Sequence, residues 1–92
     1  MLRFVFDCET NGLLHELDTV HSLVLRDIDS GDVTSCSDHD GYEPISAGLY
    51  MLSKADLLVG HNIINFDFRA LKKVYRSFKL KKNCKINDCL LY

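Results

Sequence analysis

Several features are missing from this chain of 92 residues, and each absence removes a class of protein. No apolar run approaches the roughly 20 residues that are needed to cross a bilayer. Met1-Leu2-Arg3 leads straight into a strand pattern, without the layout of a signal peptide. Repeats, low-complexity tracts and interdomain linkers are also missing. We therefore expect one soluble cytoplasmic domain over residues 1–92, with no membrane partner.

The four cysteines lack the spacing of a metal site. They contain no Cys-x-x-Cys pair, and the four histidines do not complete a zinc motif. We expect free thiols in a reducing compartment, and the alternative is a disulfide or zinc framework.

Charge is divided unevenly along the chain. Residues 1–56 hold eleven acids and three bases, whereas residues 57–92 hold two acids and eight bases. All eight bases lie between Arg69 and Lys85, with no acid among them. Such a stripe attracts phosphate backbones, and the alternative is an ordinary solvated helix face.

Apolar patterns predict strands that alternate with helices. Strands are expected at about 2–6, 20–28, 33–36 and 56–62, and a turn at 29–32 joins the second to the third. Helices are expected at 45–52, with Pro44 in the first turn, and at 65–78. Residues 86–92 fit either a last short strand or the start of a helix. This order predicts an α/β domain.

Asp7 and Glu9 stand two residues apart at the end of the first apolar strand. Side chains alternate across a strand, so both carboxylates leave one face while Cys8 packs on the other. Adjacent unpaired carboxylates repel each other, and a divalent cation between them relieves that repulsion. The alternative is that the strand ends here and its acids are solvated.

Asp67 lies on the apolar stripe of the helix predicted at 65–78, because it precedes Leu71 by four residues and Val74 by seven. A carboxylate on the buried side of a helix needs a partner. Two explanations fit the sequence. Asp67 either stabilises the first turn of the helix or binds a metal beside Asp7 and Glu9.

Asp7-x-Glu9, followed by the run His61-Asn62-Ile63-Ile64-Asn65-Phe66-Asp67 at a strand-to-helix junction, resembles the first two motifs of the DEDD 3′-to-5′ exonucleases. The segments 7–14, 20–27, 60–67 and 86–88, taken in order, resemble the amino-terminal proofreading domain of phage family A DNA polymerases. The resemblance implies a ribonuclease-H-like fold with a mixed sheet of about five strands and flanking helices. It also implies the host cytoplasm as the location of a phage-encoded protein.

The chemistry implied by this resemblance is hydrolysis of a phosphodiester at a DNA 3′ end by a pair of Mg²⁺ or Mn²⁺ ions. Asp7 would bridge both metals, Glu9 would hold the metal that activates water, and Asp67 would help to hold the second metal. Carboxylate oxygens are the ligands that these hard cations prefer. Single-stranded DNA is the implied partner, and the residues implied to contact its terminal nucleotide are Thr10, Asn11, Leu13, Asn62 and Phe66.

The family also carries a fourth carboxylate and a Tyr or His in a later Tyr/His-x-x-x-Asp motif, which has no match in this sequence. Asp88 instead matches a mainly structural aspartate on the family's last strand. We therefore expect a domain truncated at its carboxyl end and incomplete or weakly active alone, which the rest of a split DNA polymerase would complete. The alternatives are a degenerate module that binds nucleic acid without cutting it, and an interaction domain that forms a homodimer.

Overall fold

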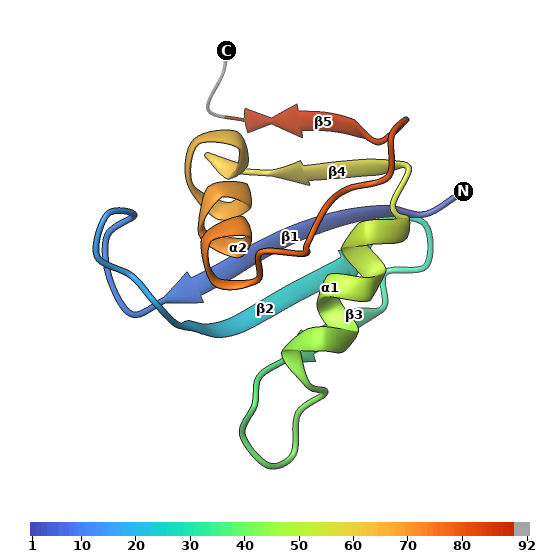
Figure 1. Ribbon diagram of the computed structural model, residues 1–92. Helices are drawn as coiled ribbons and strands as arrows, with labels where there is room; N and C mark the ends of the chain where they lie inside the picture. Colours follow the sequence, from blue (N-terminus) through green and yellow to red (C-terminus); the bar gives the residue numbers. More distant parts are fainter. Residues whose placement is uncertain (90–92) are drawn as a thin grey trace.

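Five strands form one mixed sheet in the computed structural model, which describes residues 1–89 (Figure 1). The strand order is β3-β2-β1-β4-β5. The elements in chain order are β1 (Arg3–Thr10), β2 (Val20–Asp27), β3 (Val33–Cys36), α1 (Ile45–Lys54), β4 (Leu57–Gly60), the π-helical turn η1 (Ile63–Asp67), α2 (Phe68–Val74) and β5 (Lys85–Asp88). The domain is therefore α/β, as the sequence predicts.

The central strand β1 pairs antiparallel with β2 and parallel with β4. The hairpin partner β3 runs antiparallel to β2, and β5 runs parallel to β4. β1 is longer than predicted, because pairing with β2 continues from Phe4 to Thr10 and carries the strand past both acids. β5 confirms the strand alternative as far as Asp88, and residues 90–92 lie outside the described part of the chain.

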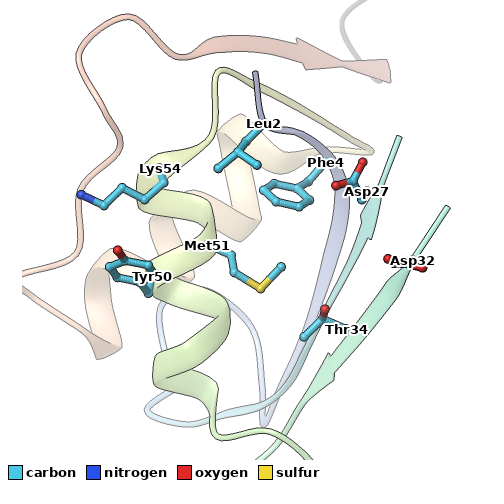
Figure 2. Close-up of a pocket in the computed structure, with 8 residues that line it drawn as sticks. All are labelled: Leu2, Phe4, Asp27, Asp32, Thr34, Tyr50, Met51 and Lys54. Atoms are coloured by element: carbon cyan, nitrogen blue, oxygen red, sulfur yellow. The ribbon is translucent and has the colours of Figure 1, made fainter. Parts of the chain in front are cut away.

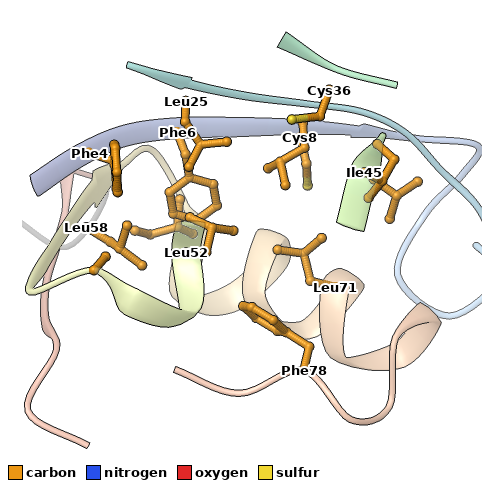
Figure 3. Packing of buried hydrophobic residues seen from close by; sticks show 14 residues of the cluster. Phe4, Phe6, Cys8, Leu25, Cys36, Ile45, Leu52, Leu58, Leu71 and Phe78 are labelled. Atoms are coloured by element: carbon orange, nitrogen blue, oxygen red, sulfur yellow. The ribbon is translucent and has the colours of Figure 1, made fainter. Parts of the chain in front are cut away.

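Both helices cover the same face of the sheet (Figures 1 and 3). Phe4, Phe6 and Cys8 of β1 point to this face and are buried. The Phe6 ring lies 5.3 Å from the Phe68 ring of α2, centroid to centroid. The rest of the core joins the sheet to both helices, with Leu23, Leu25, Cys36, Ile45, Leu52, Leu58 and Leu71 among its buried members.

The helix α1 packs closely on the sheet at Gly48. A Cβ atom at this position would lie 2.7 Å from Leu23 Cδ2 and 2.9 Å from Cys36 Sγ. Only a residue without a side chain allows this approach. Pro44 stands at the N-cap rather than inside the first turn, and α1 runs two residues beyond the predicted end.

The helix predicted at 65–78 was wrong at both ends. A π-helical turn precedes α2, and α2 itself ends at Val74, because Tyr75 leaves the helical region with φ −117° and ψ 83°. The Lys72 ammonium donates hydrogen bonds to the carbonyls of Arg76 and Phe78, which satisfies backbone acceptors beyond this end. Phe78 reaches the core from an irregular segment.

Two further expectations from the sequence concern the cysteines and membrane-spanning helices. All four cysteines are free thiols, as predicted. Among residues 1–89, no helix has the length and apolar character to span a membrane.

Candidate metal and nucleotide site

The candidate site lies where the parallel strands β1 and β4 reach their carboxyl ends. β4 pairs with β1 only from Arg3 to Val5, so the outer half of β1 extends past β4 with one edge free for other groups. Two connections leave the sheet here: the loop after Thr10 and the turn after Gly60. The carboxyl ends of parallel strands are where open α/β sheets commonly bind ligands.

Asp7 and Glu9 lie side by side on the face of the sheet opposite the two helices. Both are exposed, and they stand opposite Val24 and Ser22 of β2. The prediction that the two carboxylates share one face is confirmed. Cys8 between them is 6% exposed and packs in the core, also as predicted.

Asp67 approaches the same strand from its free edge. Its side chain is 4% exposed, and Oδ2 accepts a hydrogen bond of 3.1 Å from the backbone N–H of Cys8. The prediction of a buried carboxylate on this helix is confirmed. Asp67 stands at the N-cap of α2, but its side chain makes no cap hydrogen bond and bonds to β1 instead.

Burial makes the charge on Asp67 unfavourable. The pKa of this carboxyl is raised to about 6, mainly by burial and to a smaller extent by the negative charge of Asp7, while hydrogen bonds from Cys8 oppose both effects. Burial also raises the pKa of the Cys8 thiol well above its usual range, followed in size by the charge of Asp67. The Cys8 thiol therefore stays neutral, and a cation would relieve the repulsion between Asp67 and Asp7.

The three acids fit a hard divalent cation by donor chemistry. All are oxygen donors, and neither Asp7 nor Glu9 forms an ion pair within the described part of the chain. In the structure as it stands, no three His, Cys, Asp or Glu side chains of residues 1–89 are grouped closely enough to hold one ion. The structure thus brings Asp67 to the strand that carries Asp7 and Glu9 without forming a closed coordination shell.

The loop after β1 holds three of the predicted nucleotide contacts. Thr10 is half-buried and its hydroxyl donates to the Gly12 carbonyl at 2.9 Å. The Asn11 amide bonds the Asp18 carboxylate and the backbone N–H groups of Asp18 and Thr19, so it is occupied in shaping the loop. Leu13 is 63% exposed and offers an apolar surface at the loop tip.

The turn after β4 holds the other two, Asn62 and Phe66, both half-buried. Asn62 adopts a left-handed conformation, with φ 59° and ψ 30°, immediately before η1. Phe68 closes the π-helical turn by donating its N–H to the Ile63 carbonyl. Turns of this kind occur mostly as local insertions in helices, often at functional sites.

Asp88 fixes this turn from the neighbouring strand. Its buried carboxylate accepts the backbone N–H of Asn62 at 2.8 Å and that of Ile64 at 2.9 Å. These bonds support the structural role that the family resemblance implies for Asp88. The sequence gives little indication of these two hydrogen bonds, because it shows only one acid in an apolar segment.

A separate hollow of about 400 Å³ lies between α1 and the amino-terminal half of β1 (Figure 2). Apolar side chains of Leu2, Phe4 and Met51 line it together with Asp27 and Lys54. None of its lining residues is a predicted site residue, so this hollow is distinct from the carboxylate site.

Comparisons with known proteins give the fold alone. No protein-family profile matches this sequence, and no curated protein is significantly similar to it. Among solved structures, the chain resembles the family B DNA polymerase from the hyperthermophilic archaeon Pyrobaculum calidifontis, with a TM-score of 0.66 and 15% sequence identity. The match covers 94% of this chain and 13% of the polymerase chain. The described domain therefore has a fold that also occurs within a DNA polymerase.

Proposed function

We propose that this chain is a 3′-to-5′ exonuclease domain of the proofreading type, with a ribonuclease-H-like fold and a DEDD-type acidic site. Its substrate is the 3′ end of single-stranded DNA, and its cofactors are Mg²⁺ or Mn²⁺. The likeness to part of a DNA polymerase supports this assignment at the level of the fold. The resemblance of its motifs to those of phage family A polymerases supports the finer assignment.

The observation that carries the proposal is the position of Asp67. A buried carboxylate bonded to β1 beside Asp7 lowers the stability of the fold unless it has another role. Metal binding by Asp7, Glu9 and Asp67 supplies that role. Bound divalent cations would stabilise the charge that develops on a phosphodiester and would lower the pKa of an attacking water.

The chain's own residues have distinct tasks in this proposal. Asp7 and Glu9 present carboxylate oxygens from a rigid central strand, and Asp67 meets them from the strand's free edge. The Cys8 N–H orients the Asp67 carboxylate, and Asp88 fixes the turn that delivers it. Leu13 and Phe66 offer apolar surface to the terminal base. We propose weak activity for the chain alone, because the related exonucleases use four carboxylates, and association with the remainder of a DNA polymerase for full activity.

Incubation of the purified protein with end-labelled single-stranded DNA and Mn²⁺ tests this function. The expected result is a ladder shortened from the 3′ end by the wild type and intact substrate with Asp7→Ala. An identical ladder from both proteins would trace the activity to a contaminant. Intact substrate with both proteins, at every Mn²⁺ concentration, would contradict the proposal for this chain.

The open face of the sheet favours a second candidate function, that of an interaction module which forms a homodimer. Val5, Val24 and Val33 are 42%, 39% and 59% exposed, and their strand pairing places them on the face that no described helix covers. A second copy of the chain is the proposed occupant. Sedimentation should then show a dimer that Val24→Lys converts to a monomer, and a wild-type monomer at all concentrations would exclude this candidate.

A further inference from the structure

We infer that the groove between α2 and the loop after β1 is a backbone subsite for single-stranded nucleic acid, with Arg69 and Lys73 as its phosphate-binding residues. This inference rests on the proposed function, since it assigns a surface to the strand on which the nuclease would act. It adds a binding surface on the helix-covered side of the sheet, away from the open face that carries Asp7 and Glu9.

The groove is a feature of the shape of the molecule. Leu14, His15, Arg69 and Lys73 line a hollow of about 540 Å³. A second hollow of about 400 Å³ shares Arg69 and Lys73 and extends the surface along α2 to Phe68 and Lys72. Both hollows are open to solvent rather than enclosed, and they share Arg69 and Lys73.

No ion pair of the described residues includes a base of the groove, and Asp18 of the loop compensates Lys73 only through a weaker electrostatic interaction. The ion pairs of the described residues are Arg3 with Asp29 and Lys81 with Asp56, and neither includes a base of α2. Arg69 and Lys73 are one helical turn apart, so their charges lie on the same side of α2 about 6 Å apart along its axis. Two cations at this spacing suit a polyanion better than a single small anion.

The groove also has a fixed position relative to the candidate site. Lys73 Nζ donates a hydrogen bond of 2.9 Å to the Leu14 carbonyl, which ties α2 to the loop after β1. Arg69 follows the buried Asp67 by two residues, and the loop begins directly after Thr10. The groove and the candidate site therefore share the segment that joins η1 to α2. The exposed His15 ring and the Phe68 ring supply flat surfaces beside the cations.

Fluorescence anisotropy with a fluorescein-labelled oligothymidylate tests the inference, in EDTA so that the oligonucleotide stays intact. The groove variant is Arg69→Gln/Lys73→Gln, and the matched control is Lys79→Gln/Lys82→Gln, which removes the same charge from exposed bases outside the groove. We expect binding at least about tenfold weaker for the groove variant and nearly unchanged for the control. The slope of log K against log salt should become shallower by about 1.4, because each phosphate contact to a single strand contributes about 0.7.

An equal loss of affinity for the oligothymidylate in the two variants would overturn the inference and would indicate a general effect of charge. Unchanged binding by the groove variant would overturn it directly. Arg69→Gln alone provides a second test, because Arg69 is exposed and its removal leaves the Lys73 bond to Leu14 intact. Circular dichroism confirms that each variant folds.

Two further arms identify the ligand. Competition by polyglutamate as strong as by unlabelled oligothymidylate would overturn the inference in favour of an acidic polypeptide partner. An oligouridylate arm distinguishes DNA from RNA as the source of the backbone. Because binding is measured without metal, groove-dependent binding without cleavage would contradict the proposed exonuclease alone, and cleavage with a groove variant that binds normally would contradict this inference alone.

Discussion

Along β1, Phe4, Phe6 and Cys8 face the helices, whereas Asp7 and Glu9 face away from them. The first set is buried in a continuous apolar core, and the second carries two negative charges on an uncovered surface. Alternation along a single strand thus separates the residues that hold the fold together from those proposed to act on a substrate. Asp67 is the exception, because it is an acid that lies buried at the boundary between the two faces.

The largest loss of stability should come from a substitution on the helix-covered face of the sheet. Leu25 is 0% exposed, and Leu25→Ala should lower the free energy of unfolding by about 2–5 kcal/mol, because it removes apolar contacts and leaves a cavity. Its neighbour Val24 points to the open face, and Val24→Ala should cost less than about 1 kcal/mol. Urea denaturation of both variants gives the comparison. Equal losses would show that the open face is as important to stability as the covered one.

The second largest loss of stability should come from Asp88, whose carboxylate fixes the turn after β4. Asp88→Ala leaves the N–H groups of Asn62 and Ile64 without their acceptor and should cost about 2–3 kcal/mol. Asp88→Asn keeps one acceptor oxygen and should cost less. Hydrogen exchange at Asn62 and Ile64 should also become faster in Asp88→Ala. Unchanged exchange at these amides would mean that the turn holds its shape without the carboxylate.

The smallest change in the free energy of unfolding should be a stabilisation, and it should come from substitution of Asp67. The pKa of Asp67 is raised from 3.8 to about 6, so the folded protein binds this proton more tightly than the unfolded chain does. Stability should therefore fall as pH rises from about 4 to about 6 and then stay at its lower value. In EDTA at pH 7.5, Asp67→Asn should stabilise the protein by on the order of 1 kcal/mol and remove this part of the pH dependence. Destabilisation by Asp67→Asn would instead assign the carboxylate a structural role.

Local patterns in the sequence predicted most of the sheet and the direction of its side chains. The alternation of Phe4 and Phe6 with Asp7 and Glu9 needs only strand geometry, and the turn at 29–32 needs only a glycine able to adopt a positive φ. Gly31 does so, with φ 79°. The boundaries were less accurate where pairing decides them, since β1 reaches Thr10 only because β2 continues beside it.

The turn that delivers Asp67 could not be predicted in the same way. The left-handed Asn62 and the π-helical turn η1 depend on the carboxylate of Asp88, which lies more than twenty residues later in the chain. The early end of α2 similarly depends on Lys72 bonding to carbonyls beyond the helix. For the site, the sequence predicted that Asp67 lies on the buried side of its helix. It did not predict the hydrogen bond to the Cys8 N–H, because that contact exists only after β1 and α2 pack together.

Calorimetric titration with Mn²⁺ tests whether Asp7, Glu9 and Asp67 form one divalent-metal site. The wild type should bind Mn²⁺, and both Asp7→Asn and Asp67→Asn should abolish this binding. Asp18→Asn, which changes an acid in the loop after β1 outside the site, is the control and should bind as the wild type does. Equal heats of binding in the wild type and both site variants, or no binding by the folded wild type, would contradict the claim.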